Sequence, residues 1–257
     1  MGNHMKAEIS LTPSESKKLI AKAVLSLSSV QNALKTGILV VCRGTTNAYI
    51  LQELKDSPVE KGKYTAGYVG PQGLEVNPNP PSETIFVNGE AKEDVTLADM
   101  MKDLKHGDVI VNGANAIGPD GIPGLLIGRR NPKTTGGTLG IFQTTAMARG
   151  IDIIIPVGLE KSIPVSVLAG SKEISSDMIE WATGMPCGLI PMFGTVITEV
   201  EALRLLAGVE AIPIAAGGIG GAEGSIVLLL KGTESEVRKA IGLIERTKGE
   251  APVREPK

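Results

Sequence analysis

Five consecutive residues, Arg43-Gly44-Thr45-Thr46-Asn47, carry groups suited to binding an anion. They follow a strongly apolar run and precede a segment with helical periodicity, so a helix is expected to begin among them. The first backbone N–H groups of a helix have no partner within it, and beside two hydroxyl groups they favour a phosphate or a carboxylate. The arginine would add a bidentate contact. The alternative is that a threonine only caps the helix and the glycine only permits the turn, which leaves the arginine unexplained.

Further polar turns are expected at the same edge of one sheet. The apolar runs at residues 38–42, 108–113 and 151–157 are typical of strands buried on both faces. In open parallel sheets the ligand binds beyond the carboxyl ends of the strands. The predicted ligand-binding residues are therefore Arg43, Gly44, Thr45, Thr46, Asn47, Asn112, Gly113, Asn115, Lys133, Gly136, Gly137 and Thr138. Two more cations, Arg129 and Arg130, precede Lys133 in the chain.

Three residues are candidates for chemistry as well as binding. Asp120 is the best single candidate for a general base, although Asp-Gly also favours a plain turn. Cys42 lies beside an arginine at a predicted helix N-terminus, where the pKa of a thiol falls, or else it is inert strand packing. Glu223 is the third, and it stands in the glycine-rich residues 217–224. His106 is expected to be an ordinary surface histidine, which leaves no Ser-His-Asp or Cys-His arrangement.

The composition excludes several classes of protein. A formal net charge of -2 argues against a surface for nucleic acid or for an anionic membrane. The two cysteines, Cys42 and Cys187, suit neither a disulfide framework nor a metal site, so no metal is expected. No apolar run reaches the roughly 18 residues of a membrane span and no signal-peptide core is present, so a cytoplasmic location is expected. No dinucleotide-binding glycine motif or Walker lysine occurs, which leaves the cofactor unknown.

The elements that must position these residues follow from caps and periodicity. Thr12-Pro13-Ser14-Glu15 is a capping box with proline at the first helical position, and it predicts one long amphipathic helix that ends at Gly37. Residues 70–81, rich in Gly, Pro and Asn, predict a loop. A capped helix is expected at 96–105 and a strand at 165–168. The alternation of strands and helices predicts an α/β fold with an open, mostly parallel sheet and helices on both faces.

The pattern changes beyond Trp181. Strand-like, helical, strand-like, strand-like and helical segments follow one another and suggest a small α+β unit similar to a ferredoxin-like one. We expect an α/β ligand-binding domain at residues 12–184, the small unit at 185–250 and a disordered tail at 251–257.

Two stretches together, and a third that follows them, resemble one superfamily, which joins ribose-5-phosphate isomerase, glucosamine-6-phosphate deaminase and the CoA transferases and also includes sugar-responsive repressors and initiation-factor regulatory subunits. Residues 43–46 after a buried strand resemble its first phosphate loop, and residues 108–121 resemble its second signature, a strand running into a Gly-Ala-Asp/Asn turn and an Asp/Glu-Gly bend. Residues 135–138 resemble its third loop. The resemblance covers about residues 12–170 and implies the isomerase/CoA transferase-like fold.

The chain departs from the family pattern at the positions that perform chemistry. The isomerases place an acid in the second signature, where Asn112 and Asn115 stand here. Their third loop carries a lysine within the glycine run, whereas Lys133 precedes it here. CoA transferases use a glutamate nucleophile, for which Glu223 is the only candidate with suggestive surroundings, and it lies outside the matched region.

These observations predict binding of a small phosphorylated or carboxylated metabolite, similar to a sugar phosphate, with an isomerase- or lyase-type activity. A non-catalytic metabolite sensor is the alternative, because the matched loops hold few acid–base groups, and a CoA transferase-like enzyme is a second one. Whether the protein is an enzyme stays open at this point. The family resemblance also implies a homo-oligomer.

Overall fold

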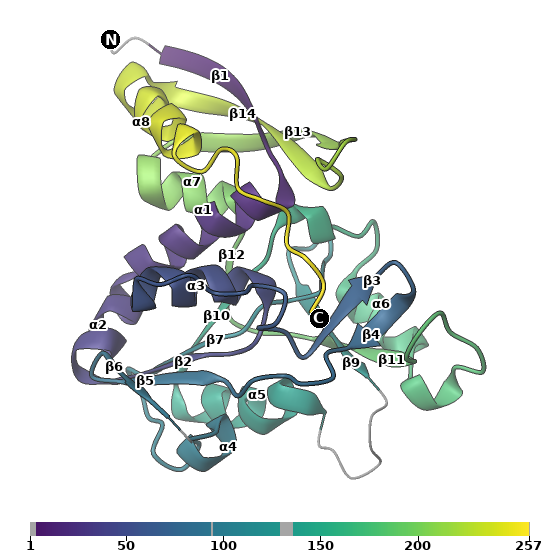
Figure 1. Ribbon diagram of the computed structural model, residues 1–257. Coiled ribbons are helices and arrows are strands. Elements are labelled where there is room, and N and C mark those ends of the chain that lie inside the picture. Colours follow the sequence, from purple (N-terminus) through teal and green to yellow (C-terminus); the bar gives the residue numbers. More distant parts are fainter. Residues whose placement is uncertain (1–3, 94, 129–135, 257) are drawn as a thin grey trace.

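A six-stranded sheet forms the centre of the molecule in the computed structural model, which describes residues 4–93, 95–128 and 136–256 (Figure 1). The order is β12 (Thr195–Ile197), β10 (Asp152–Pro156), β7 (Val109–Val111), β2 (Ile38–Val41), β5 (Thr84–Val87) and β6 (Glu90–Lys92). The first four strands run parallel, β5 pairs antiparallel with β2, and β6 pairs antiparallel with β5. The predicted α/β class with a mostly parallel sheet is therefore confirmed.

Helices cover both faces of this sheet, as predicted. One face packs against α1 (Pro13–Ser26), α2 (Ser28–Thr36), α3 (Thr45–Lys55) and α7 (Glu199–Ala207). The other face packs against α4 (Leu97–Met100) and α5 (Gly137–Arg149). Because successive side chains of a strand point to opposite faces, Leu39 and Val41 of β2 belong to the first core and Val40 to the second.

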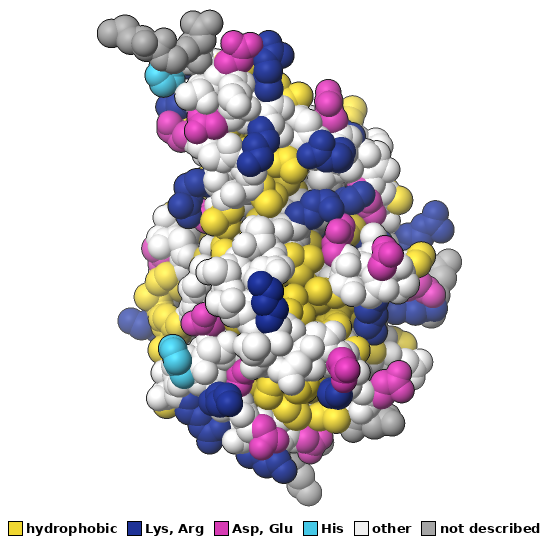
Figure 2. All heavy atoms as spheres, turned by 90° about the vertical axis from the view of Figure 1, so that its left-hand side faces the viewer, with side chains coloured by type: hydrophobic (Ala, Val, Ile, Leu, Met, Phe, Trp, Pro, Cys, Tyr) yellow, Lys and Arg dark blue, Asp and Glu magenta, His cyan; other side chains and the backbone are white. Residues whose placement is uncertain are grey.

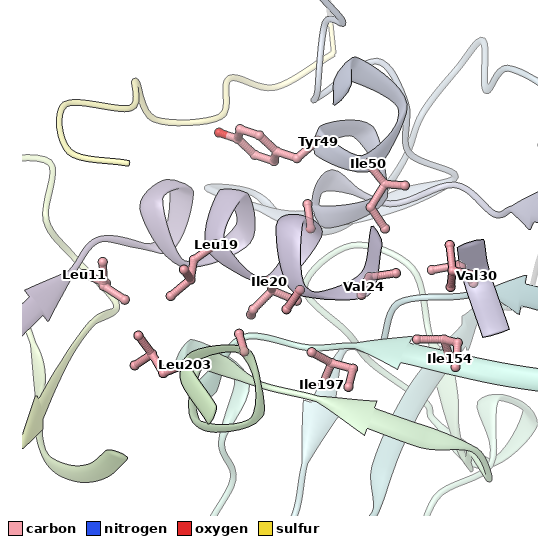
Figure 3. Packing of buried hydrophobic residues seen from close by; sticks show 14 of the residues in the cluster. Leu11, Leu19, Ile20, Val24, Val30, Tyr49, Ile50, Ile154, Ile197 and Leu203 are labelled. Atoms are coloured by element: carbon pink, nitrogen blue, oxygen red, sulfur yellow. The ribbon is translucent and has the colours of Figure 1, made fainter. Parts of the chain in front are cut away.

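Helix α1 lies at the centre of the first core. Figure 3 shows its residues Ile20 and Val24 facing Ile154 of β10 and Ile197 of β12, and all four side chains are buried. The predicted capping box is present, since the Thr12 side chain accepts from the Glu15 N–H and the Glu15 side chain accepts from the Thr12 N–H. These two hydrogen bonds fix the residue at which α1 begins.

The long helix predicted as far as Gly37 is interrupted at Leu27, which is extended (φ -65°, ψ 135°) and separates α1 from α2. The hydroxyl of Ser26 donates to the Ala23 carbonyl at 2.7 Å, and such local bonds compete with the helical pattern. Gly37 ends α2, as predicted.

A second sheet has the order β1 (His4–Leu11), β14 (Ser225–Thr233) and β13 (Glu210–Gly217), and α7 and α8 (Glu234–Glu245) pack on it. The pairing of β1 with β14 is antiparallel and joins the start of the chain to the predicted small unit. The sequence did not indicate β1. The boundary predicted near residue 184 stays a prediction, although two strands that follow it, β11 (Cys187–Pro191) and β12, pair with strands that precede it.

Several connections differ from their predictions. The loop predicted at 70–81 contains β4 (Gly73–Val76), which pairs with β3 (Gly67–Gly70). The helix predicted at 96–105 is only α4. The strand predicted at 165–168 is wrong, because α6 (Val167–Glu173) begins there, with the Ser166 hydroxyl accepting from the Ala169 N–H. The remaining elements are β8 (Ala116–Ile117), β9 (Pro123–Gly128), and the 3-10 helices η1 (Leu159–Lys161) and η2 (Ser176–Met178).

The described part of the C-terminal segment is extended, and it lies beside the loop after α3. A side chain at Gly62 would meet the Arg254 carbonyl oxygen at 1.9 Å, so the two backbones approach closely. Glu250 pairs with Lys18 of α1 at 2.8 Å. The disorder predicted for residues 251–257 stays a prediction.

Candidate functional site

The first two predicted turns lie side by side, and Asn47 joins them. Its side-chain N–H group donates to the Cys42 carbonyl at 2.7 Å and to the Val111 carbonyl at 3.3 Å, at the ends of β2 and β7. The residue is completely buried, and its Oδ1 atom has no hydrogen-bond partner within the described ranges. Asn47 therefore fixes the start of α3 to the carboxyl edge of the sheet.

Arg43 brings the third turn to the same place. Its Nη2 atom donates to Glu83 at 2.6 Å and to the Thr138 hydroxyl, at the start of α5, at 2.9 Å. Glu83 precedes β5, which runs antiparallel to β2, so the start of one strand lies beside the end of the other. Because Glu83 balances the charge of Arg43, an anion here would depend mainly on neutral donors.

Neutral donors are present at the first turn of α3. Gly44 is its N-cap, and no side chain caps the helix, so the alternative that a threonine acts only as a cap is wrong. The Gly44 N–H donates to the Tyr64 carbonyl at 2.8 Å. Among the described residues, the N–H groups of Thr45, Thr46 and Asn47 have no hydrogen-bond partner. This first turn is therefore an electropositive helix end that no side chain satisfies.

The amides of the second turn have mainly structural contacts. The Asn112 side chain donates to the Gly113 carbonyl at 3.1 Å. Asn115 accepts from the Leu126 N–H at 3.0 Å and so attaches β9 to this turn. Gly136, Gly137 and Thr138 lie at the start of α5, whereas Arg129, Arg130 and Lys133 lie outside the described residues.

Cys42 does not have the lowered pKa that its position suggested. The residue is completely buried, and burial, together with the charge of Glu83, raises the pKa of its thiol despite the opposing effect of Arg43. A thiol in this state is not a nucleophile at neutral pH. The alternative reading, inert strand packing, fits the structure.

The two candidate carboxylates, Asp120 and Glu223, are exposed and make local contacts. Asp120 accepts from the Ser166 hydroxyl at 2.6 Å and from the Ile122 N–H at 3.2 Å. The hydrogen bond from Ser166 is the main cause that holds the pKa of Asp120 below its usual range, which makes it a weak base. Glu223 accepts from the Gly221 N–H at 2.9 Å within its own turn. His106 is exposed and contacts the Gly150 carbonyl at 3.0 Å.

A group of charged residues that the sequence analysis missed lies at the ends of β10 and β12. Lys17 of α1 forms an ion pair with Glu160 of η1, and both side chains are largely buried. Lys161 donates through Nζ to the Ala114 carbonyl at 2.7 Å, in the turn after β7. Glu199, at the start of α7, is completely buried and accepts from the Leu159 N–H at 2.9 and 3.2 Å. We call these four residues the ionic cluster.

Burial shifts the pKa values of two members of the ionic cluster. It lowers the pKa of Lys161 to about 8, with the charge of Lys17 acting in the same direction and those of Glu160 and Glu199 opposing it. Burial raises the pKa of the Glu199 carboxyl, against the hydrogen bonds from Leu159 and Ser16. An amine and a carboxyl group shifted toward their neutral forms are suited to proton transfer.

The small sheet lies beside the ionic cluster. At Gly224, in the turn between β13 and β14, a side chain would meet Pro13 at 3.2 Å and Glu160 at 3.6 Å. The carboxyl end of β10 therefore lies between the start of α1 and the glycine-rich turn.

On the face that Figure 2 shows, basic and acidic side chains are interspersed, with hydrophobic side chains between them. Within the described ranges, no group of three or more His, Cys, Asp or Glu side chains could hold a metal ion. None of the described helices is long and apolar enough to cross a membrane.

Comparison of the chain with protein-family models, curated protein sequences and solved structures finds no match.

Proposed function

We propose that the carboxyl edge of the six-stranded sheet binds a small phosphorylated or carboxylated metabolite similar to a sugar phosphate. The uncapped first turn of α3 supports this most directly, because the N–H groups of Thr45, Thr46 and Asn47 converge there without other partners in the described part of the chain. Each charge-assisted bond to an anion contributes about 1.5–3 kcal/mol. The Thr45 hydroxyl and the guanidinium of Arg43 complete the donor set.

The proposal includes the fold relationship that the motifs suggested, an isomerase/CoA transferase-like domain with a ferredoxin-like unit. On this view the reaction is an isomerase- or lyase-type step on the bound metabolite. The residues that support chemistry are then in the ionic cluster, since Cys42, Asp120 and Glu223 lie in other surroundings. A cytoplasmic location and a homo-oligomeric state stay predictions.

A non-catalytic sensor is the second candidate. It is favoured by Asn112 and Asn115, which supply amides where the isomerases have an acid. The CoA transferase alternative has less support, because the Glu223 carboxylate is exposed and accepts a hydrogen bond within its own turn.

Thermal unfolding with ribose 5-phosphate, with free ribose as the reference, tests the binding proposal. At a hundredfold excess over Kd, binding stabilises the folded state by about 2.7 kcal/mol, which is roughly 5–10 °C for a chain of this length. Thr45→Val is expected to abolish most of this shift. The control is Thr36→Val, at the exposed end of α2, which should retain it. An equal shift in both variants would show that the first turn of α3 is not the binding site.

A further inference from the structure

The side chain of Lys161 has an unusual set of contacts for a lysine. Its Nζ atom donates to the backbone carbonyl of Ala114 and takes part in no ion pair among those between described residues. The neighbouring carboxylate of Glu160 is engaged by Lys17 instead. The amine therefore points at the turn after β7, in the middle of the proposed binding edge, and the residue as a whole is only partly buried.

The surroundings of Lys161 favour the uncharged amine, which is the nucleophilic form. The charged groups that face it are Lys17 from α1, Glu160 from η1 and Glu199 from α7. With a pKa of about 8, roughly a tenth of the amine is neutral at pH 7, compared with less than about a thousandth for an ordinary lysine. Lysines that react with carbonyl compounds are activated in this way, by burial or by a second cation nearby.

The distance across the edge fits a substrate with an anionic group at one end and a carbonyl group at the other. Lys161 follows β10, and the uncapped turn of α3 follows β2, with β7 between them. Because the Lys161 amine reaches the turn after β7, its lateral separation from the α3 turn is between one and two strand spacings, about 5–10 Å, which an open-chain pentose phosphate can span. A phosphate at Thr45 would therefore bring the distal carbonyl carbon toward Lys161.

We propose that Lys161 forms an imine with the carbonyl carbon of the metabolite bound at this edge, an inference that rests on the proposed function. The neutral amine adds to the carbonyl carbon, and the carbinolamine then loses its hydroxyl group as water. Glu199, the buried carboxyl group of the cluster that is not ion-paired in the described structure, gives its proton to that hydroxyl group and takes back the proton that the nitrogen loses. The product is an imine and one water molecule, and no oxidant or reductant is consumed.

Reductive trapping tests this inference on the wild-type chain. Ribose 5-phosphate, whose open-chain form carries its aldehyde at the end far from the phosphate, is added with cyanoborohydride, which delivers hydride to the imine carbon and leaves a stable secondary amine, and the modified peptide is mapped by mass spectrometry. We expect Lys161 to be modified at least tenfold faster than any other lysine, with a rate that rises with pH and is half-maximal near pH 8. Modification spread over exposed lysines without preference for Lys161 would overturn the inference.

Two variants sharpen the test. Lys161→Arg keeps a cation but cannot form an imine, so the adduct should be lost, whereas Lys172→Arg, an exposed lysine on α6, should leave it unchanged. If ribose 5-phosphate stabilises the wild type but no adduct forms at Lys161, the imine is wrong and the binding proposal stands. If free ribose is trapped at Lys161 as fast as ribose 5-phosphate, the amine is reactive and the anion site is wrong.

Discussion

Arg43 and Glu83 form an ion pair of 2.6 Å at the edge where the sequence suggested a bidentate contact from the arginine to a bound anion. The Glu83 side chain is only 9% exposed, and the pair also reaches the Thr138 hydroxyl. The three contacts connect the end of β2 with the starts of β5 and α5. The pair therefore both assembles the edge and reduces the positive charge that a ligand would meet there.

Removing the charge of Glu83 is expected to strengthen anion binding. In Glu83→Gln the Arg43 guanidinium is no longer neutralised, so the Kd for ribose 5-phosphate should fall about tenfold, as expected for one additional charge-assisted contact. Calorimetric titration measures this. Glu90→Gln, an exposed acid on β6, makes the same change in net charge and should alter Kd little. An equal effect of both variants would mean that only the overall charge matters.

Arg43→Ala is expected to destabilise the fold by about 2 kcal/mol, between the values for exposed and fully buried pairs, because it leaves the Glu83 carboxylate without its cation. Urea unfolding measures the change. The double variant Arg43→Ala, Glu83→Gln should be less destabilised than the sum of the two single changes. Simple additivity would show that the two side chains do not interact in solution.

Asn47→Ala is expected to cost about 2 kcal/mol, since two buried carbonyl groups, of Cys42 and Val111, lose their donor. The melting temperature should fall accordingly. Asn32→Ala, at an exposed position of α2, is the matched control and should change stability by less than about 0.5 kcal/mol. Similar effects at both positions would contradict the joining role of Asn47.

Glu15 is expected to make stability depend on pH. Burial alone would raise its pKa, but bonds from the Thr12 N–H, Lys248 and the Gly249 N–H outweigh this and hold the pKa below its usual range. The stabilisation is therefore complete above the ordinary carboxyl pKa and is lost as pH falls through the lower, folded-state value. Glu15→Gln should lose about 2 kcal/mol at pH 7 and progressively less below about pH 4, measured by urea unfolding.

The exposed Glu53, which pairs with Lys22, is the control for this pH dependence. Glu53→Gln should change stability by less than about 1 kcal/mol at either pH. If the effect of Glu15→Gln were the same at pH 7 and pH 3, the carboxylate of Glu15 would not be the source of the stabilisation.

Local signals predicted much of the fold. The β-branched runs gave β2 and β10, and the caps at Thr12 and Thr96 each start a helix in the structure. These predictions succeeded because a cap or a buried strand depends on neighbours only a few residues away. The strand predicted at 165–168 failed because Val165, Val167 and Leu168 form a run of apolar residues typical of a strand, whereas the Ser166 hydroxyl caps the helix that begins there.

The site was predicted less completely. The turns after β2 and β7 could be placed at one edge from the rule for parallel sheets. The partners that decide their chemistry could not, since Glu83 reaches Arg43 only through an antiparallel strand, and Lys17 meets Glu160 across 143 residues. The lowered pKa of Lys161 likewise depends first on burial and then on Lys17, a residue far away in the sequence.

The pairing of β1 with β14 has a consequence for biosynthesis. On the ribosome β1 is made first and β14 only after the whole six-stranded sheet, so Met5, Ala7 and Ile9 have no strand to pair with during most of translation. Pairings between such distant segments form late, and an unpaired apolar strand attracts other nascent chains. The small sheet, and with it the enclosure of Glu160 by the glycine-rich turn, should be the last part of the molecule to mature.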